Sequence, residues 1–156
     1  MNITITTPSD REIAITRQFN APRALVFKAM STPELIKRWL VGTPGWVLAV
    51  CEVDARAGGA YRYVWKKNDT EMGMGGVFLE FSPPERWVGT EKFDNPWYEG
   101  ECIGTTVLTE DAGRTTMTLT LRYDSKSIRD AVLKSGMERG LEHSYNLLAE
   151  VVTSAS

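Results

Sequence analysis

The strongest constraint on the fold is an alternating aromatic segment between residues 60 and 67. Tyr61, Tyr63 and Trp65 occupy every second position, so in a β-strand their side chains leave the sheet on the same face. Tyrosine and tryptophan combine a large apolar ring with one polar group, which needs a hydrogen-bonding partner when it is buried. Such a face is typical of the wall of a cavity or cleft. The segment therefore predicts a pocket for an amphiphilic molecule, without identifying that molecule.

Length and charge limit the classes of protein to consider. A chain of 156 residues suits a single domain over residues 1–156, with its core at about 11–152. The net charge of −2 and the scattered Lys and Arg residues argue against a nucleic-acid partner. No signal peptide is evident, and no apolar run reaches the roughly 20 residues of a membrane span. We therefore expect a cytoplasmic protein with no membrane partner and with free, buried thiols at Cys51 and Cys102. A homodimer is left open.

The pattern along the chain predicts an α+β fold. Residues 11–19 alternate like a strand, Pro22 opens a short helix, and Thr32-Pro33-Glu34 starts a second one. Turn residues then separate segments that alternate like strands, at 46–53, 60–67, 75–81, 87–93, 101–109 and 114–123. Helical spacing returns from Ile128 to Val152, with a kink expected at Gly136. The economical arrangement is a curved antiparallel sheet of about six to seven strands, with two short helices, around one long C-terminal helix that encloses a cavity.

Five short motifs, in this order, resemble the SRPBCC or START-like helix-grip superfamily. They are Asn20–Phe27, Ser31–Trp39, Glu52–Tyr61, Phe81–Trp87 and Ser135–Gly140. Within the superfamily the chain is most similar to the family named for the activator of the 90-kDa heat-shock-protein ATPase (AHSA-like). The resemblance implies a helix-grip fold that holds hydrophobic or amphiphilic ligands between sheet and long helix. Other members of the superfamily are polyketide aromatases and cyclases, and the namesake of the family is a co-chaperone.

Three further aromatic residues are candidates for the pocket. Trp39 ends the second short helix, where it either lines the cavity mouth or anchors that helix in the core. Trp97 and Tyr98 lie in a segment between two strands, and loops carry binding residues more often than packing residues. They either gate one end of the cavity or fold back onto the core.

Two glycines and the single histidine follow one face of the long helix. Gly136 and Gly140 are four residues apart, and His143 continues the stripe. An interior glycine costs a helix roughly 1 kcal/mol relative to alanine. The glycines therefore either permit close packing against the sheet or leave space for a ligand. His143 either points into the pocket as an acid, base or hydrogen-bond donor, or lies at the surface.

No catalytic motif is present. A single histidine excludes a His-rich metal site, no Gly-x-Ser-x-Gly elbow occurs, and the spacing of the acidic residues pairs no two carboxylates on one inward face. We therefore predict a soluble protein without catalytic residues, metal or cofactor, which binds a small hydrophobic or amphiphilic molecule. Two alternatives are a cyclase, dehydratase or hydrolase that uses the same cavity, and a co-chaperone-like interaction module. The predicted ligand contacts are Trp39, Tyr61, Tyr63, Trp65, Trp97, Tyr98, Gly140 and His143.

Overall fold

The computed structural model describes residues 3–154, which form an antiparallel sheet and four helices. Along the chain the elements are β1 (Thr4–Thr6), β2 (Glu12–Phe19), α1 (Arg23–Ser31), α2 (Pro33–Ile36), β3 (Val47–Val53), β4 (Ala60–Lys67), β5 (Thr70–Ser82), β6 (Arg86–Phe93), β7 (Cys102–Asp111), β8 (Arg114–Arg122), α3 (Lys126–Leu133) and α4 (Met137–Ser154). The eight strands of this region follow the order β1-β2-β8-β7-β6-β5-β4-β3, and every neighbouring pair is antiparallel. The predicted α+β fold is confirmed.

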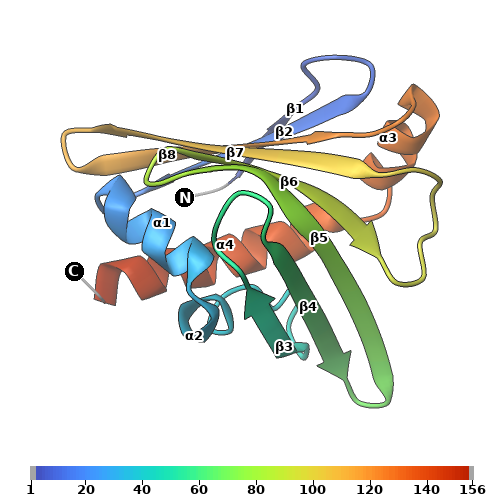
Figure 1. The fold of residues 1–156 in the computed structure, drawn as a ribbon, viewed down its shortest axis with the longest axis horizontal. Coiled ribbons are helices and arrows are strands. Elements are labelled where there is room, and N and C mark those ends of the chain that lie inside the picture. Colours follow the sequence, from blue (N-terminus) through green and yellow to red (C-terminus); the bar gives the residue numbers. More distant parts are fainter. Residues whose placement is uncertain (1–2, 155–156) are drawn as a thin grey trace.

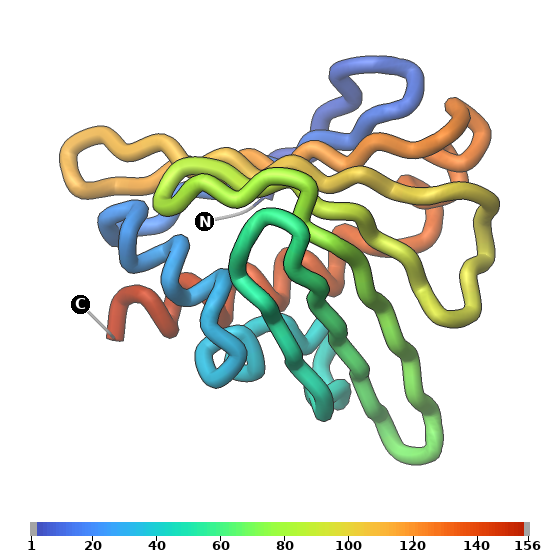
Figure 2. The backbone as a smooth tube through the Cα atoms, in the orientation of Figure 1, coloured from blue at the N-terminus to red at the C-terminus, as the bar shows by residue number. Residues whose placement is uncertain are grey.

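The sheet bends around α4. In Figure 1, β2, β8, β7 and β6 cross above the long helix, whereas β5, β4 and β3 turn downward in front of it. The smooth trace in Figure 2 shows α1 and the following segment on the same side of the sheet as α4. The helices therefore cover the concave face, and the space between α4 and the sheet is the place for a core or a cavity. No helix within residues 3–154 has the length and apolar character needed to span a membrane.

The hairpin between β7 and β8 closes at Glu110-Asp111-Ala112-Gly113, whose turn chemistry predicts a hairpin between the segments 101–109 and 114–123. Asp111 pairs with Arg114, so only Ala112 and Gly113 make the turn. Both residues have positive φ, 53° and 78°. A two-residue turn of this kind matches the twist of the strands that it joins.

Two features of the sheet differ from the prediction. The three-residue edge strand β1 pairs with β2 and is too short to give a recognisable alternation. In addition, β5 begins at Thr70 rather than at residue 75, because Lys67 pairs with Thr70 across a two-residue turn. The early glycines of β5 are thus strand residues. A Cβ on Gly76 would collide with the Thr90 carbonyl and lie 2.8 Å from the Tyr61 ring, so the missing side chain makes room for both groups.

The space between α4 and the sheet has two parts. At one end, Leu148, Val151 and Val152 are buried in a cluster that also contains Ile15 and Met117. We call this the packed end. At the other end, the first two turns of α4 face a cavity, and we call this the hollow end. A second buried cluster joins α2 to strands β3, β4 and β5, and Ile36, Leu48, Tyr61 and Trp65 belong to it.

Gly136 lies between two helices rather than inside one. It has a φ of 86° and separates α3 from α4. This left-handed conformation favours glycine and ends a helix. The predicted kink is therefore a complete break, and Gly136 carries no cost of an interior helical glycine.

Candidate ligand-binding cavity

The cavity at the hollow end has a volume of about 550 Å³. It is bounded by the first half of α4, by strands β4 to β8 and by the segment that leads from α2 into β3. Most of its wall is apolar or aromatic. The aromatic residues of the wall are Trp46, Tyr61, Tyr63, Trp65, Phe78, Trp87, Phe93, Trp97, Tyr98, Tyr123 and Tyr145.

The alternating residues of β4 face this cavity together. Tyr61, Tyr63 and Trp65 all lie in its wall, as period-two geometry requires. The Tyr61 hydroxyl donates to the Thr90 carbonyl, and the Trp65 indole N–H donates to the Leu40 carbonyl at 2.8 Å. The two bonds hold these rings in fixed positions. Among residues 3–154, no hydrogen bond involves the Tyr63 hydroxyl, which leaves it available to a ligand.

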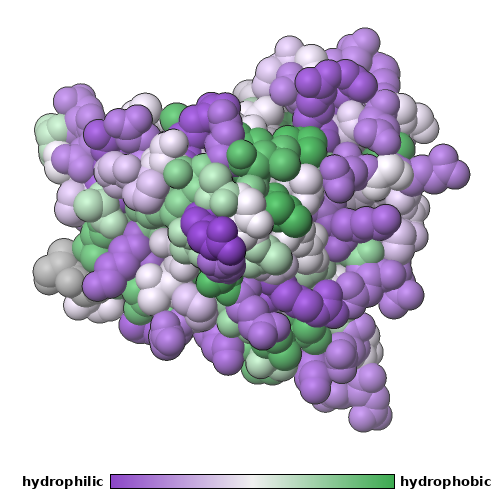
Figure 3. All heavy atoms as spheres, viewed as in Figure 1, coloured by the Kyte–Doolittle hydropathy of each residue, from purple (hydrophilic) through white to green (hydrophobic). Residues whose placement is uncertain are grey.

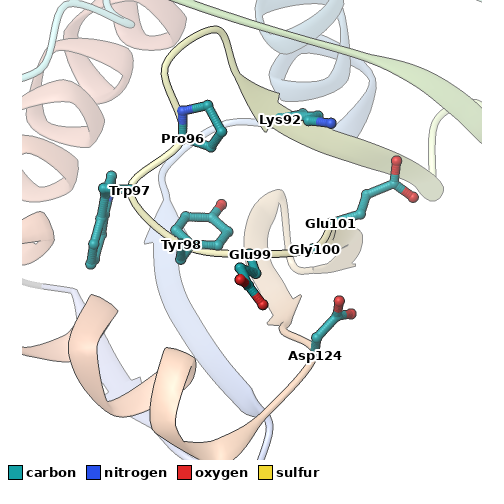
Figure 4. A pocket seen from close by; sticks show the side chains of 8 residues that line it. All are labelled: Lys92, Pro96, Trp97, Tyr98, Glu99, Gly100, Glu101 and Asp124. Atoms are coloured by element: carbon teal, nitrogen blue, oxygen red, sulfur yellow. The ribbon is translucent and has the colours of Figure 1, made fainter.

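Trp97 and Tyr98 stand at the edge of the cavity. The Trp97 side chain is 55% exposed, whereas the Tyr98 ring packs edge-to-face on Tyr123, with ring centroids 5.6 Å apart. Both rings also border a second hollow of about 740 Å³, which we call the loop pocket (Figure 4). The loop pocket combines charged side chains with aromatic rings and is lined by Lys92, Pro96, Trp97, Tyr98, Glu99, Gly100, Glu101 and Asp124. The two rings thus separate the cavity from the loop pocket. Gating by this loop stays a prediction.

Gly140 lies in the cavity wall, but its close neighbour is a loop rather than the sheet. A Cβ built on Gly140 would lie 3.6 Å from the Cα of Gly42. The next turn of α4 is tied to the same residue. The Ser144 hydroxyl accepts a hydrogen bond from the Gly42 N–H at 2.9 Å, and His143 Nδ1 lies 2.6 Å from the Gly42 carbonyl. Since a carbonyl only accepts, we assign the proton to Nδ1.

Two of the predicted contacts, Trp39 and His143, are not among the wall residues. Trp39 is buried, donates its indole N–H to the Ala29 carbonyl at 3.0 Å and lies 6.0 Å from the Tyr145 ring. Trp39 therefore lies in the core, where the alternative interpretation places it as an anchor of the second short helix. The His143 ring is directed to the Gly42 carbonyl. The other six predicted residues share the wall.

Glu91, an acidic residue, lies in the cavity wall but is not among the predicted ligand contacts. On β6, Trp87, Gly89, Glu91 and Phe93 alternate along the strand and all face the cavity. Within residues 3–154, no hydrogen bond or ion pair reaches the Glu91 carboxylate. Burial therefore raises the pKa of Glu91 to about 7. The sequence does contain a signal for it, because period-two alternation along β6 places Glu91 on the same face as Trp87 and Phe93.

The Glu91 carboxylate occupies space that a glycine provides. A Cβ on Gly104, which lies in the adjacent strand β7, would be 2.5 Å from Glu91 Oε2. The charge is also near every tyrosine of the chain. After burial, Glu91 helps to raise the pKa of Tyr61, Tyr63, Tyr98, Tyr123 and Tyr145. The five rings therefore surround one carboxylate.

Metal binding and cysteine reactivity are the remaining kinds of chemistry to consider. Across residues 3–154, no three His, Cys, Asp or Glu side chains are grouped so that they could hold a metal ion. Cys51 and Cys102 are both buried and free. Burial raises the pKa of Cys51 to about 11, and burial followed by the nearby Glu91 charge raises that of Cys102 further. Neither thiol has the lowered pKa of a reactive cysteine.

Comparisons with known proteins agree with this architecture. A Rhodobacter sphaeroides protein of known structure is 27% identical, with a TM-score of 0.93, and the match covers 99% of both chains. A Mycobacterium smegmatis protein is 21% identical over 97% of this chain and 98% of its own, with a TM-score of 0.85. An AHSA1-like protein from Aeromonas hydrophila is 15% identical over 91% and 93%, with a TM-score of 0.66. These last two show the fold alone.

No curated protein matches the chain. The family model described as "Activator of Hsp90 ATPase homolog 1-like protein" matches residues 20–153, which is most of the sequence. This match agrees with the resemblance carried by the five short motifs. The chain therefore belongs to the Activator of Hsp90 ATPase homolog 1-like family.

Proposed function

We propose that this protein binds a small hydrophobic or amphiphilic molecule in the cavity between α4 and the sheet. The observation that carries the proposal is the cavity itself, with a volume of about 550 Å³ and a wall rich in aromatic rings. Pockets for small molecules typically measure roughly 300–1,000 Å³ and combine an apolar lining with a few polar groups. The cavity has both properties.

Different groups of the cavity wall supply the affinity for a ligand and fix its orientation. Apolar surface removed from water contributes roughly 25 cal/mol per Å², and the aromatic rings supply most of that surface. Several polar groups of the wall are free to fix a ligand in one pose. The Tyr63 hydroxyl and the Glu91 carboxylate are two of them, since neither is used by a hydrogen bond within residues 3–154. A ligand with an apolar body and one polar end matches this arrangement.

A thermal-shift screen tests the proposal. Purified protein is heated with lipids, sterols, aromatic polyketides, flavonoids and alkyl amphiphiles. A ligand present at about 100 times its Kd adds roughly 2.7 kcal/mol of stability, which raises the Tm of a domain of this size by about 5–10 °C. We expect one chemical class to give this shift. A flat screen across all classes would contradict the proposal.

A pair of variants locates the binding. Leu141 lies in the cavity wall on α4, so Leu141→Trp places an indole in the cavity and should abolish the ligand-induced shift. Leu79, on β5, is 54% exposed and lies outside the wall, so Leu79→Trp adds the same group elsewhere and should preserve the shift. If Leu141→Trp retains the full shift, the ligand binds at another place.

Glu91 supports one alternative function, an enzyme that uses the same cavity. A general acid or base works best when its pKa is near the working pH, and burial brings the pKa of Glu91 to about 7. Each ligand class that shifts the Tm is therefore incubated with the protein and examined by mass spectrometry. Product formed by the natural protein and lost in Glu91→Gln supports turnover. Unchanged ligand supports binding alone.

A further inference from the structure

The cavity wall contains one acidic side chain and no basic one. Among its lining residues, all within the described part of the chain, there is no Lys, Arg or His, and Glu91 is the single Asp or Glu. The neighbouring Lys92 borders the loop pocket instead. When Glu91 is ionised, the cavity therefore carries a negative charge, and no cation within its wall balances that charge.

The carboxylate is in a costly position. Removing a charge from water is unfavourable unless an opposite charge or several hydrogen bonds compensate, and buried carboxylates are normally paired. Glu91 accepts no hydrogen bond and joins no ion pair within residues 3–154. Gly104, on the adjacent strand, keeps the space beside Oε2 clear. The missing partner of Glu91 is therefore to be sought in the cavity rather than in the protein.

The surrounding rings favour a positive charge as well. The faces of Trp, Tyr and Phe rings attract cations, and Trp attracts them most strongly. Trp65, Trp87 and Phe93 share the wall with Glu91, together with all five tyrosines of the chain. A carboxylate among aromatic rings complements an organic cation with an apolar body. A neutral or anionic amphiphile uses the rings but leaves the carboxylate unpaired.

We propose that the cavity binds an amphiphilic amine, whose protonated nitrogen pairs with the Glu91 carboxylate while its apolar body lies among the aromatic rings. The inference rests on the proposed binding function and adds the chemical class of the ligand. It also assigns a role to Gly104, which sets the position of the carboxylate without contributing a side chain.

Glu91 controls the pH dependence of this binding. The titratable groups that face it are Tyr61 and Tyr63 on β4, Tyr98 before β7, Cys102 on β7, Tyr123 after β8 and Tyr145 on α4. Burial, with help from the Glu91 charge, raises the pKa of each of them, so all six stay neutral near neutral pH. An alkylammonium group resembles lysine, with a pKa of about 10.4, and stays charged. Protonation of Glu91 therefore weakens amine binding as the pH falls below about 7.

Three probes with the same tail test the proposal: decylamine, decanol and decanoate, measured by calorimetric titration below their micelle concentrations. At about pH 8 we expect decylamine to bind about tenfold more tightly than decanol, and decanoate to bind most weakly. Between about pH 8 and pH 5.5 the affinity for decylamine should fall about tenfold or more, whereas that for decanol should change little.

Two variants assign the effect to Glu91. Glu91→Gln keeps the shape of the side chain. It should lower the affinity for decylamine to that for decanol and remove the pH dependence of binding. Glu101→Gln removes the same charge at an exposed position of the loop pocket, outside the cavity, and should leave both properties unchanged. Gly104→Ala retains the Glu91 charge but displaces it, and should also lower the affinity for decylamine without lowering that for decanol. Circular dichroism establishes that each variant is folded.

The outcomes are distinguishable. If decanol or decanoate binds as tightly as decylamine, or if the preference survives in both Glu91→Gln and Gly104→Ala, the amine proposal is wrong while the cavity still binds ligands. If none of the three probes binds, the amine proposal and the proposed binding function both fail. A preference for decylamine that disappears in Glu91→Gln and persists in Glu101→Gln supports the proposal.

Discussion

The two ends of α4 face the same sheet and are filled in different ways. At the packed end, Leu148 and Val152 are completely buried in a continuous cluster. At the hollow end, Gly140, Leu141 and Ser144 face a cavity of about 550 Å³. Branched aliphatic side chains interdigitate to the density of organic crystals, whereas rigid rings and a glycine leave space between them. One helix thus combines a structural half with a half suited to binding.

The sheet shows the same division. Buried residues such as Ile13, Ile15 and Met117, on β2 and β8, complete the packed end. On β4 and β6, tyrosine, tryptophan, glycine and glutamate face the hollow end. The first group therefore contributes stability through aliphatic packing alone, whereas the second group also shapes the cavity. A polar residue such as Glu91 is tolerated at the hollow end because its local cost is offset by the aliphatic cluster at the packed end.

The largest expected effect comes from truncating a leucine at each end of α4. Leu148→Ala removes a fully buried side chain and should lower the free energy of unfolding by about 3 kcal/mol. Leu141→Ala enlarges an existing cavity and should cost about 1 kcal/mol or less. Urea denaturation measures both values. Equal losses would show that the hollow end contributes as much stability as the packed end.

Glu91→Gln should stabilise the protein. In the folded state burial raises the pKa of Glu91 from 4.5 to about 7. The folded protein thus holds this proton more tightly than the unfolded chain does. The resulting contribution to stability is complete below about pH 4.5 and is lost as the pH rises through about 7.

At about pH 8, the Gln variant should therefore be more stable than the natural protein by up to about 3 kcal/mol. Below about pH 4.5 the stabilities of the two proteins should converge. Denaturation series at several pH values measure the difference. A constant difference at every pH would mean that the carboxylate does not titrate differently in the folded state.

Trp39, in the buried cluster of the packed end, and Trp65, in the cavity wall, allow a matched test. Each donates its indole N–H to a backbone carbonyl, Trp39 to Ala29 and Trp65 to Leu40. Trp39→Phe and Trp65→Phe should each cost about 1.5 kcal/mol, through a lost hydrogen bond and lost volume. Only Trp65 lies in the cavity wall, so only Trp65→Phe should change ligand affinity. An affinity change in Trp39→Phe would show that Trp39 contributes to ligand binding although it lies outside the cavity wall.

The period-two pattern accounts for what could be predicted from the sequence. It placed Tyr61, Tyr63 and Trp65 on one face, and the structure puts all three in the cavity wall. The same pattern on β6 would have found Glu91. The criterion of paired carboxylates does not identify Glu91, because a single carboxylate faces the cavity. The hairpin at Ala112 and Gly113 followed from turn chemistry.

Other features depend on contacts that local patterns do not contain. Whether Trp39 meets the cavity or the core is decided by α1 and α4, which supply the Ala29 carbonyl and the Tyr145 ring. The orientation of His143 depends on Gly42, which is 101 residues away along the chain. A space-filling view shows a further limit, since hydrophobic side chains also gather in the middle of an exposed face (Figure 3). Hydrophobicity alone therefore does not separate wall, core and surface.

The smallest expected effect concerns the two glycines at the start of α4. At Gly140, inside the helix, a Cβ would make ordinary contacts of 3.6 Å or more with the Gly42 and Thr43 backbone, so Gly140→Ala should gain up to about 1 kcal/mol of stability. At Gly136 nothing lies within 4 Å, but φ is 86°, so Gly136→Ala should lose about 1 kcal/mol through backbone strain. Thermal denaturation measures the two signs. Stabilisation by both substitutions would show that α3 and α4 tolerate a continuous helix across Gly136, whereas destabilisation by both would show that the hollow end has no room for one methyl group at Gly140.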